Sequence, residues 1–160
     1  SLLTILLLGL GAVLFYNLHS LRLGPEQPVP FSHRLHANEK MISCFMCHEG
    51  AMKSERAGIP PTETCMLCHD NIIIRHPEIE KLRTYYAADS ALEWVKVTEL
   101  PDFVFFNHSL HIYRKLDCSE CHGNVLQMDR IERTYEFKMK FCVDCHRENK
   151  ASLDCFTCHR

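Results

Sequence analysis

The chain has 160 residues and a formal net charge of −2, so it has room for one domain or two small ones. Ten cysteines and eleven histidines are a high share for this length. The sequence contains no glycine-rich nucleotide loop, no nucleophile elbow and no basic patch, which excludes the nucleotide-binding, serine-hydrolase and nucleic-acid-binding classes that depend on them.

The first twenty residues contain no Asp, Glu, Lys or Arg. A helix of that length spans roughly 30 Å, which matches the apolar core of a bilayer. Neither the basic start nor the small-residue cleavage site of a signal peptide is visible. We therefore expect residues 1–20 to form one uncleaved transmembrane anchor; the alternative is an apolar helix buried in a partner. His19, at the edge of this segment, is expected to have an interfacial or loop role.

A Pro-rich stretch follows, with the sequence LGPEQPVP at residues 23–30. Proline favours extended, semi-rigid spacers. We predict a linker over 21–30 and a single folded domain over 31–160.

Five Cys-x-x-Cys pairs account for all ten cysteines, and each pair is followed at once by His. This is the attachment signature of c-type haem, in which both thiols form thioethers to the porphyrin and the histidine ligates the iron. Zinc sites also use Cys-x-x-Cys but do not require His after every pair. Disulfides require neither the Cys-x-x-Cys spacing nor the following His. The motifs are Cys44, Cys47 and His48; Cys65, Cys68 and His69; Cys118, Cys121 and His122; Cys142, Cys145 and His146; Cys155, Cys158 and His159.

Five covalent haems on about 140 residues leave too little polypeptide for an ordinary apolar core around each cofactor. The porphyrins must supply most of the core. The predicted fold class is therefore a multihaem cytochrome c with a few short helices, long loops and minimal sheet. Haem c is attached outside the cytoplasm, which places the haem domain in the periplasm and the anchor in the inner membrane.

The longest span without a haem motif lies between Asp70 and Leu116. Apolar residues at helical spacing predict a helix over about 78–87, and a shorter helix is expected around 90–96. Tyr85, Tyr86 and Trp94 give this region an aromatic side, which would cover a haem or form a docking surface for another subunit.

Two Phe-x-His-x-x-His units stand before the first and third motifs at nearly equal spacing, and they contain His33, His36, His108 and His111. These four histidines are predicted to be sixth ligands of haem irons. The units mark a repeat, with one copy over 31–69, a second over 106–146 and the fifth haem over 155–159.

His76 is the tentative sixth ligand of the remaining haem, with Met128 or Met139 as alternatives. His/Met ligation would raise that haem's potential above the His/His value. If every iron has two protein ligands, no coordination site is open to a substrate, so the ligand count favours electron transfer over substrate reduction.

The paired histidine units resemble those of the cytochrome c7/c3 family. That resemblance implies that the first histidine of a pair ligates the haem just downstream and that the second reaches another haem. The implied pairs are His33 with His48, His36 with His69, His108 with His122 and His111 with His146. His159 would then face His76 or a methionine.

A longer resemblance covers most of the chain, through FSHRLH, IPPTETCMLCH, LPDFVFFNHSLH, CHGNVLQM and FCVDCHR. These segments are similar to the membrane-anchored pentahaem cytochrome subunit of alternative complex III and of the related menaquinone reductase complex. The implied partners are an iron–sulfur/molybdoenzyme-like subunit, a polytopic quinone-binding subunit and a soluble periplasmic cytochrome. Thr98 stands where members often carry His, and motifs four and five lie close together, which favours the menaquinone reductase branch and puts the fifth haem's ligation in doubt.

The expected function is thus electron transfer within a quinone-linked membrane complex, with no catalytic residue and no enzyme activity of its own. The alternative is a stand-alone membrane-anchored quinol dehydrogenase cytochrome that feeds periplasmic reductases. The 23 residues between Ser20 and Cys44 disfavour direct contact of the first haem with quinol. A terminal multihaem reductase is disfavoured because every motif is unaltered.

Overall fold

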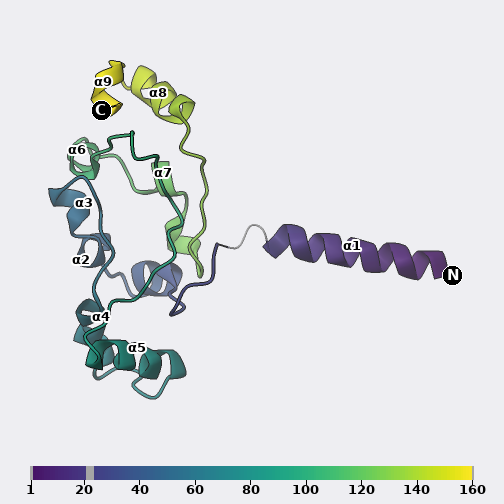
Figure 1. The fold of residues 1–160 in the computed structure, drawn as a ribbon. Coiled ribbons are helices and arrows are strands. Elements are labelled where there is room, and N and C mark those ends of the chain that lie inside the picture. Colours follow the sequence, from purple (N-terminus) through teal and green to yellow (C-terminus); the bar gives the residue numbers. More distant parts are fainter. Residues whose placement is uncertain (1, 21–23, 160) are drawn as a thin grey trace.

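Short helices and long loops make up the cytochrome region, as the haem density predicts (Figure 1). The structure is a computed structural model that describes residues 2–20 and 24–159, with side chains in the first helix described over 4–16. Within these residues there is no strand, only one antiparallel bridge between Val104 and His159. The elements are α1 (Leu2–Ser20), the π-helix η1 (Arg34–Glu39), α2 (Cys44–Cys47), α3 (Gly50–Lys53), α4 (Thr62–His69), α5 (Pro77–Ala87), α6 (His108–Tyr113), α7 (Ser119–His122), the 3-10 helix η2 (Val125–Gln127), α8 (Met139–Glu148) and α9 (Cys155–Cys158).

The first helix, α1, exposes large apolar side chains to solvent. Ile5, Leu8 and Phe15 are each at least 70% exposed. Within residues 2–20 and 24–159, however, no helix combines the length and apolar character that crossing a membrane requires. The structure therefore gives the predicted anchor over residues 1–20 no support, and the side chain of His19 lies outside the described ones.

In motifs one, three and five the residue before the first cysteine caps a short helical turn, whereas motifs two and four lie within the longer helices α4 and α8. The side chains of Ser43, Asp117 and Asp154 accept hydrogen bonds from the backbone N–H two residues ahead. Ser and Asp are preferred at such positions because they satisfy N–H groups that have no partner within the helix. The turn is closed by the motif histidine, whose N–H donates to the carbonyl of the first cysteine in motifs one, three and five: His48 to Cys44 (2.8 Å), His122 to Cys118 (2.9 Å) and His159 to Cys155 (2.9 Å).

The largest buried apolar cluster lies between α4 and α5. Met66 of α4 packs with Ile79 and Leu82 of α5, and Leu82 is only 3% exposed. The helix predicted over 78–87 is confirmed as α5, and it begins at Pro77, where the missing N–H costs nothing. His76 caps this helix by accepting a hydrogen bond at Nδ1 from the N–H of Glu78.

The shorter helix predicted around 90–96 is wrong, because this segment has no regular secondary structure. Leu92 is buried in the α4–α5 cluster, and Trp94 packs against it. The N–H and carbonyl of Val95 both bond to the side-chain amide of Gln27, at 2.9 and 3.0 Å. These bonds take the place of helical ones, and the tertiary contacts override the local apolar pattern.

The described part of the Pro-rich segment, residues 24–30, packs against the cytochrome region instead of acting as a free tether. Val29 is 7% exposed and belongs to the α4–α5 cluster. Gly24 lies so close to the backbone of Ile131 that a Cβ would fall 1.7 Å from its carbonyl oxygen. The segment is therefore anchored at both ends of its described range.

Substitution of Leu82 by Ala is expected to lower the free energy of unfolding by about 2–5 kcal/mol, because it leaves a cavity in the chain's main apolar cluster. Denaturant unfolding of the haem-loaded protein, followed by far-UV circular dichroism, would measure this. Leu110→Ala is the matched control, since Leu110 also lies on a helix but is 61% exposed. Equal losses in both variants would contradict the assignment of the core.

Candidate haem centres

Four pairs of histidine rings face one another, and each pair joins a motif histidine to a histidine of a Phe-x-His-x-x-His unit. They are the pairs implied by the c7/c3 resemblance. The distances between ring centroids and the interplanar angles are 6.4 Å and 6° for His33–His48, 6.1 Å and 66° for His36–His69, 6.4 Å and 3° for His108–His122, and 6.1 Å and 36° for His111–His146.

The spacing of these rings fits one metal ion between each pair. Two imidazole–metal bonds of about 2 Å each, with the depth of each ring from its nitrogen to its centre, add up to roughly 6 Å. The two histidines of each pair therefore leave room for an iron between them.

The protons on these rings point away from the iron position. Nδ1 of six histidines contacts a backbone carbonyl, which accepts and never donates, so Nδ1 carries the proton and Nε2 is left free to bind metal. Such bonds also orient the ring and raise its basicity as a ligand. The pairs are His36–Ser32 (2.8 Å), His48–Gly58 (2.7 Å), His69–Ile72 (3.3 Å), His108–Glu55 (2.8 Å), His111–Asn107 (2.8 Å) and His146–Ser152 (2.7 Å).

The sequence pattern did not indicate these acceptors, because any residue type can supply a carbonyl. Five of them lie within 10 residues of the histidine that they hold. Glu55 is different, since it lies in the first copy and accepts from His108 in the second.

His33 is an exception, because its Nδ1 is buried without a hydrogen-bond partner. Burial, followed by the nearby His48 and His36, lowers the pKa of His33 to about 4. Burial, followed by His108 and His48, also lowers the pKa of His122. Both imidazoles are thus held in the neutral form that ligates metal.

All ten cysteines are free thiols, so the disulfide interpretation is not realised in the structure. Burial is the main cause that raises the pKa of several of them, including Cys47, Cys65 and Cys121. These three thiols are partly buried.

The fifth motif has different surroundings. The ring of His159 stacks on Phe103, with centroids 5.9 Å apart and an angle of 25° between the planes. Next to this contact, the N–H of Phe105 donates to the carbonyl of Cys158 at 2.7 Å. Phe103 has no donor atom for a metal, and sequence reasoning did not anticipate its place beside the fifth motif.

The structure does not bring His76 to His159. His76 begins α5, and α5 lies at the opposite end of the cytochrome region from α9 in Figure 1. Its Nδ1 accepts the N–H of Glu78, which places any ring proton on Nε2, the nitrogen a haem iron would need. His76 is therefore occupied as a helix cap.

The two methionines considered for the fifth haem also have defined places. The carbonyl of Met128 accepts the N–H of Arg34, so its backbone is tied to the first histidine unit. Met139 begins α8 and is 66% exposed. Neither has a described contact with His159.

Comparison with known proteins agrees with this geometry. Residues 104–160 match the family model described as cytochrome c7 and related cytochrome c. The chain is also 31% identical, over 84% of its own length and 77% of the relative's, to the multiheme cytochrome c subunit of menaquinone reductase from Nitratidesulfovibrio vulgaris (strain Hildenborough). The chain therefore belongs to the family of c7-like multihaem cytochromes c that includes this menaquinone reductase subunit.

Proposed function

We propose that this protein is an electron-transfer subunit of a quinone-linked membrane oxidoreductase complex, and that it relays electrons through five covalently attached haems c. Its relative is named as a subunit of menaquinone reductase, which supports a link to quinone and to further subunits. The same relationship slightly favours menaquinone reduction over quinol oxidation as the reaction of the complex.

The observation that carries the proposal is the set of four histidine pairs, each spaced for one iron. An iron held between two imidazoles has no open position for a substrate. When bound, each haem supplies one-electron redox chemistry, and bis-histidine ligation favours low potentials. An electron carrier that is not itself an enzyme fits four such sites better than a reductase does.

The residues of the chain hold and orient the haems in this proposal. The ten motif cysteines form the thioethers, and His48, His69, His122, His146 and His159 bind one side of the irons. His33, His36, His108 and His111 close the other side of the first four. Backbone carbonyls hold the Nδ1 protons and so keep the rings aimed at the irons.

We further propose that α1 attaches the subunit to its complex in the inner membrane, with the haem region in the periplasm. The exposed apolar side chains of α1 support this, since such a surface is stable only when lipid or another subunit covers it. The partners are then an iron–sulfur/molybdoenzyme-like subunit, a polytopic quinone-binding subunit and a soluble periplasmic cytochrome.

Replacement of His36 by Ala is expected to open one iron. One haem in five would change from low spin to high spin, because the haem of motif two would lose its sixth ligand. Low-temperature EPR of the oxidised protein measures this change as a gain in the high-spin signal relative to the unchanged chain. His76→Ala is the matched control and should add no high-spin signal, since His76 caps α5. A high-spin gain in the control alone would contradict the ligand assignment.

The count of five haems can be checked on the same protein. The pyridine haemochrome assay should give five haems per chain, and Cys155→Ser with Cys158→Ser should reduce the number to four. The same number of haems in the unchanged chain and in the double variant would mean that motif five does not carry haem.

Extraction from native membranes in mild detergent tests the proposed assembly. The chain should co-purify with further redox subunits, and the assembled complex should react with a menaquinone analogue while the isolated chain should not. A chain that purifies alone and still oxidises quinol would instead be the stand-alone quinol dehydrogenase cytochrome.

A further inference from the structure

The two copies of the repeat contact one another through equivalent hydrogen bonds. The N–H of Arg34 donates to the carbonyl of Met128 at 3.0 Å, and the N–H of Ser109 donates to the carbonyl of Ser54 at 3.1 Å. Arg34 and Ser109 each follow the first histidine of their unit. Met128 and Ser54 each lie six residues after the histidine of the first motif in the other copy.

The helices around these bonds follow the same reciprocal pattern. η1, which carries His36 of the first copy, packs against η2 in the second copy. α6, which carries His108 and His111 of the second copy, packs against α3 in the first. The contact is isologous, as in a two-fold dimer, although it lies within one chain.

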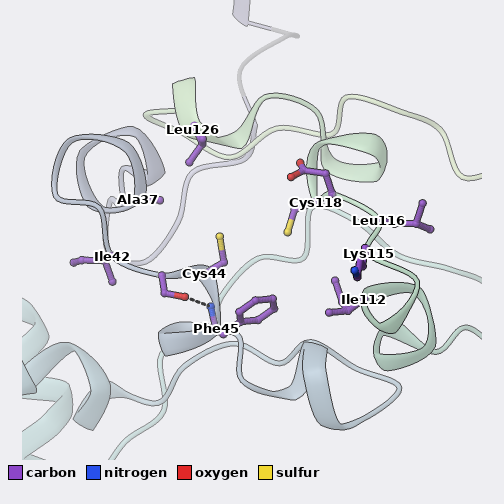
Figure 2. Close-up of a pocket in the computed structure, with 11 residues that line it drawn as sticks. Ala37, Ile42, Cys44, Phe45, Ile112, Lys115, Leu116, Cys118 and Leu126 are labelled. Carbon is purple, nitrogen blue, oxygen red and sulfur yellow. Dashed lines mark hydrogen bonds between the residues drawn. The ribbon is translucent and has the colours of Figure 1, made fainter.

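Equivalent residues also line a cavity of about 470 Å³ between the copies (Figure 2). Cys44, the first cysteine of motif one, lies across this cavity from Cys118, the first cysteine of motif three, and both sulfur atoms point into it. Burial, followed by Cys44, raises the pKa of Cys118, which agrees with their proximity. The haems attached to these two sulfurs must share this space.

Each histidine unit then links an inner motif to an outer one. His33 and His36 face His48 of motif one and His69 of motif two. The second unit does the same for motifs three and four. Motifs one and three are thus inner and meet at the cavity, whereas motifs two and four point outward from it.

The fifth motif lies at the motif-four end. The loop between α8 and α9 accepts the Nδ1–H of His146 at the carbonyl of Ser152, 2.7 Å away. Burial, followed by Cys158, raises the pKa of Cys142. Figure 1 shows α8 and α9 together at one end of the cytochrome region, and α4 and α5 at the other.

We propose that the two copies join head to head, so that the haems lie in the order two–one–three–four–five and not in the order of their motifs along the sequence. The haems of motifs two and five are the ends of this line, and electrons enter and leave there. This inference rests on the proposed function, which supplies the five haems. It adds the path of the electrons between the haems and the two haems at which electrons enter and leave.

The path has a structural reason. The second histidine of each unit reaches outward to the next motif in sequence, so each copy has its first haem innermost. Reciprocal contact between the copies can then only place the first haem of one copy, at motif one, beside the first haem of the other, at motif three. Sequence order would instead require motif two to contact motif three, and the cavity between Cys44 and Cys118 leaves that role to motif one.

Iron positions in the haem-loaded chain test the order directly. A crystal of the full chain, measured at the iron absorption edge, should show motif-one iron with those of motifs two and three as its nearest neighbours. Motif-two iron should have only motif-one iron beside it. If the motif-two iron adjoins the motif-three iron, the proposed order is wrong, while the electron-transfer function still stands. Fewer than five irons would count against the proposed haem content. The irons that are present would still report the order.

Two neighbouring variants test the order in solution. His33→Met raises the potential of haem one, and His36→Met raises that of haem two, because methionine ligation favours the reduced iron. Haems interact electrostatically most strongly with their neighbours. A titration that resolves each haem by NMR should show that His33→Met alters the apparent potentials of haems two and three, while His36→Met alters that of haem one alone.

The opposite pattern of potential changes would mean that the haems lie in the order of their motifs along the sequence. In that case His33→Met would alter haem two alone, and His36→Met would alter haems one and three. Each variant is the control for the other, since they change the same kind of ligand in one unit. If either variant fails to fold, the iron positions of the unchanged chain decide the order.

Discussion

The structure depends on pairs of imidazole rings held about one metal ion apart. Four such pairs join residues far apart in sequence, with centroid distances of 6.1–6.4 Å. An iron that binds both rings is a cross-link, and its bond energy contributes to folding because an unfolded chain holds no such site. The buried apolar cluster is small and lies at the α4–α5 end, so iron bound by the histidine pairs would stabilise the rest of the described residues.

Each Phe-x-His-x-x-His unit performs two tasks with one short helix. Its two histidines serve different motifs, and its phenylalanine stacks on the second of them, at 4.3 Å in the first copy and 4.4 Å in the second. The ring planes are nearly parallel at the inner motifs and inclined at the outer ones. Because this difference recurs in both copies, it belongs to the repeat and not to one site.

The copies are not identical in their electrostatics. His108 has the carbonyl of Glu55 as its acceptor, whereas Nδ1 of His33 has none. At the corresponding place beside His33, the side chains of Ser32 and Arg34 bind the carboxylate of Asp129. A ligand without an acceptor is a weaker electron donor, so irons bound at the two inner motifs would be chemically distinct.

The sequence by itself determined the chemistry of this protein. Spacing within the motifs dictates the cofactor, since thioether formation and proximal ligation act within one helical turn, and proline after His76 with helical apolar spacing determined α5. The tertiary structure alone decided three other matters: that 90–96 is not helical, that Val29 of the Pro-rich segment packs into the apolar cluster, and that the two copies meet beside motifs one and three. These depend on hydrogen bonds between residues distant in the chain, such as Gln27 with Val95 and Ser109 with Ser54, and many of them use backbone groups that every residue type possesses. Local patterns carry no record of such partners, which is why the haem order that we propose follows the fold and not the sequence.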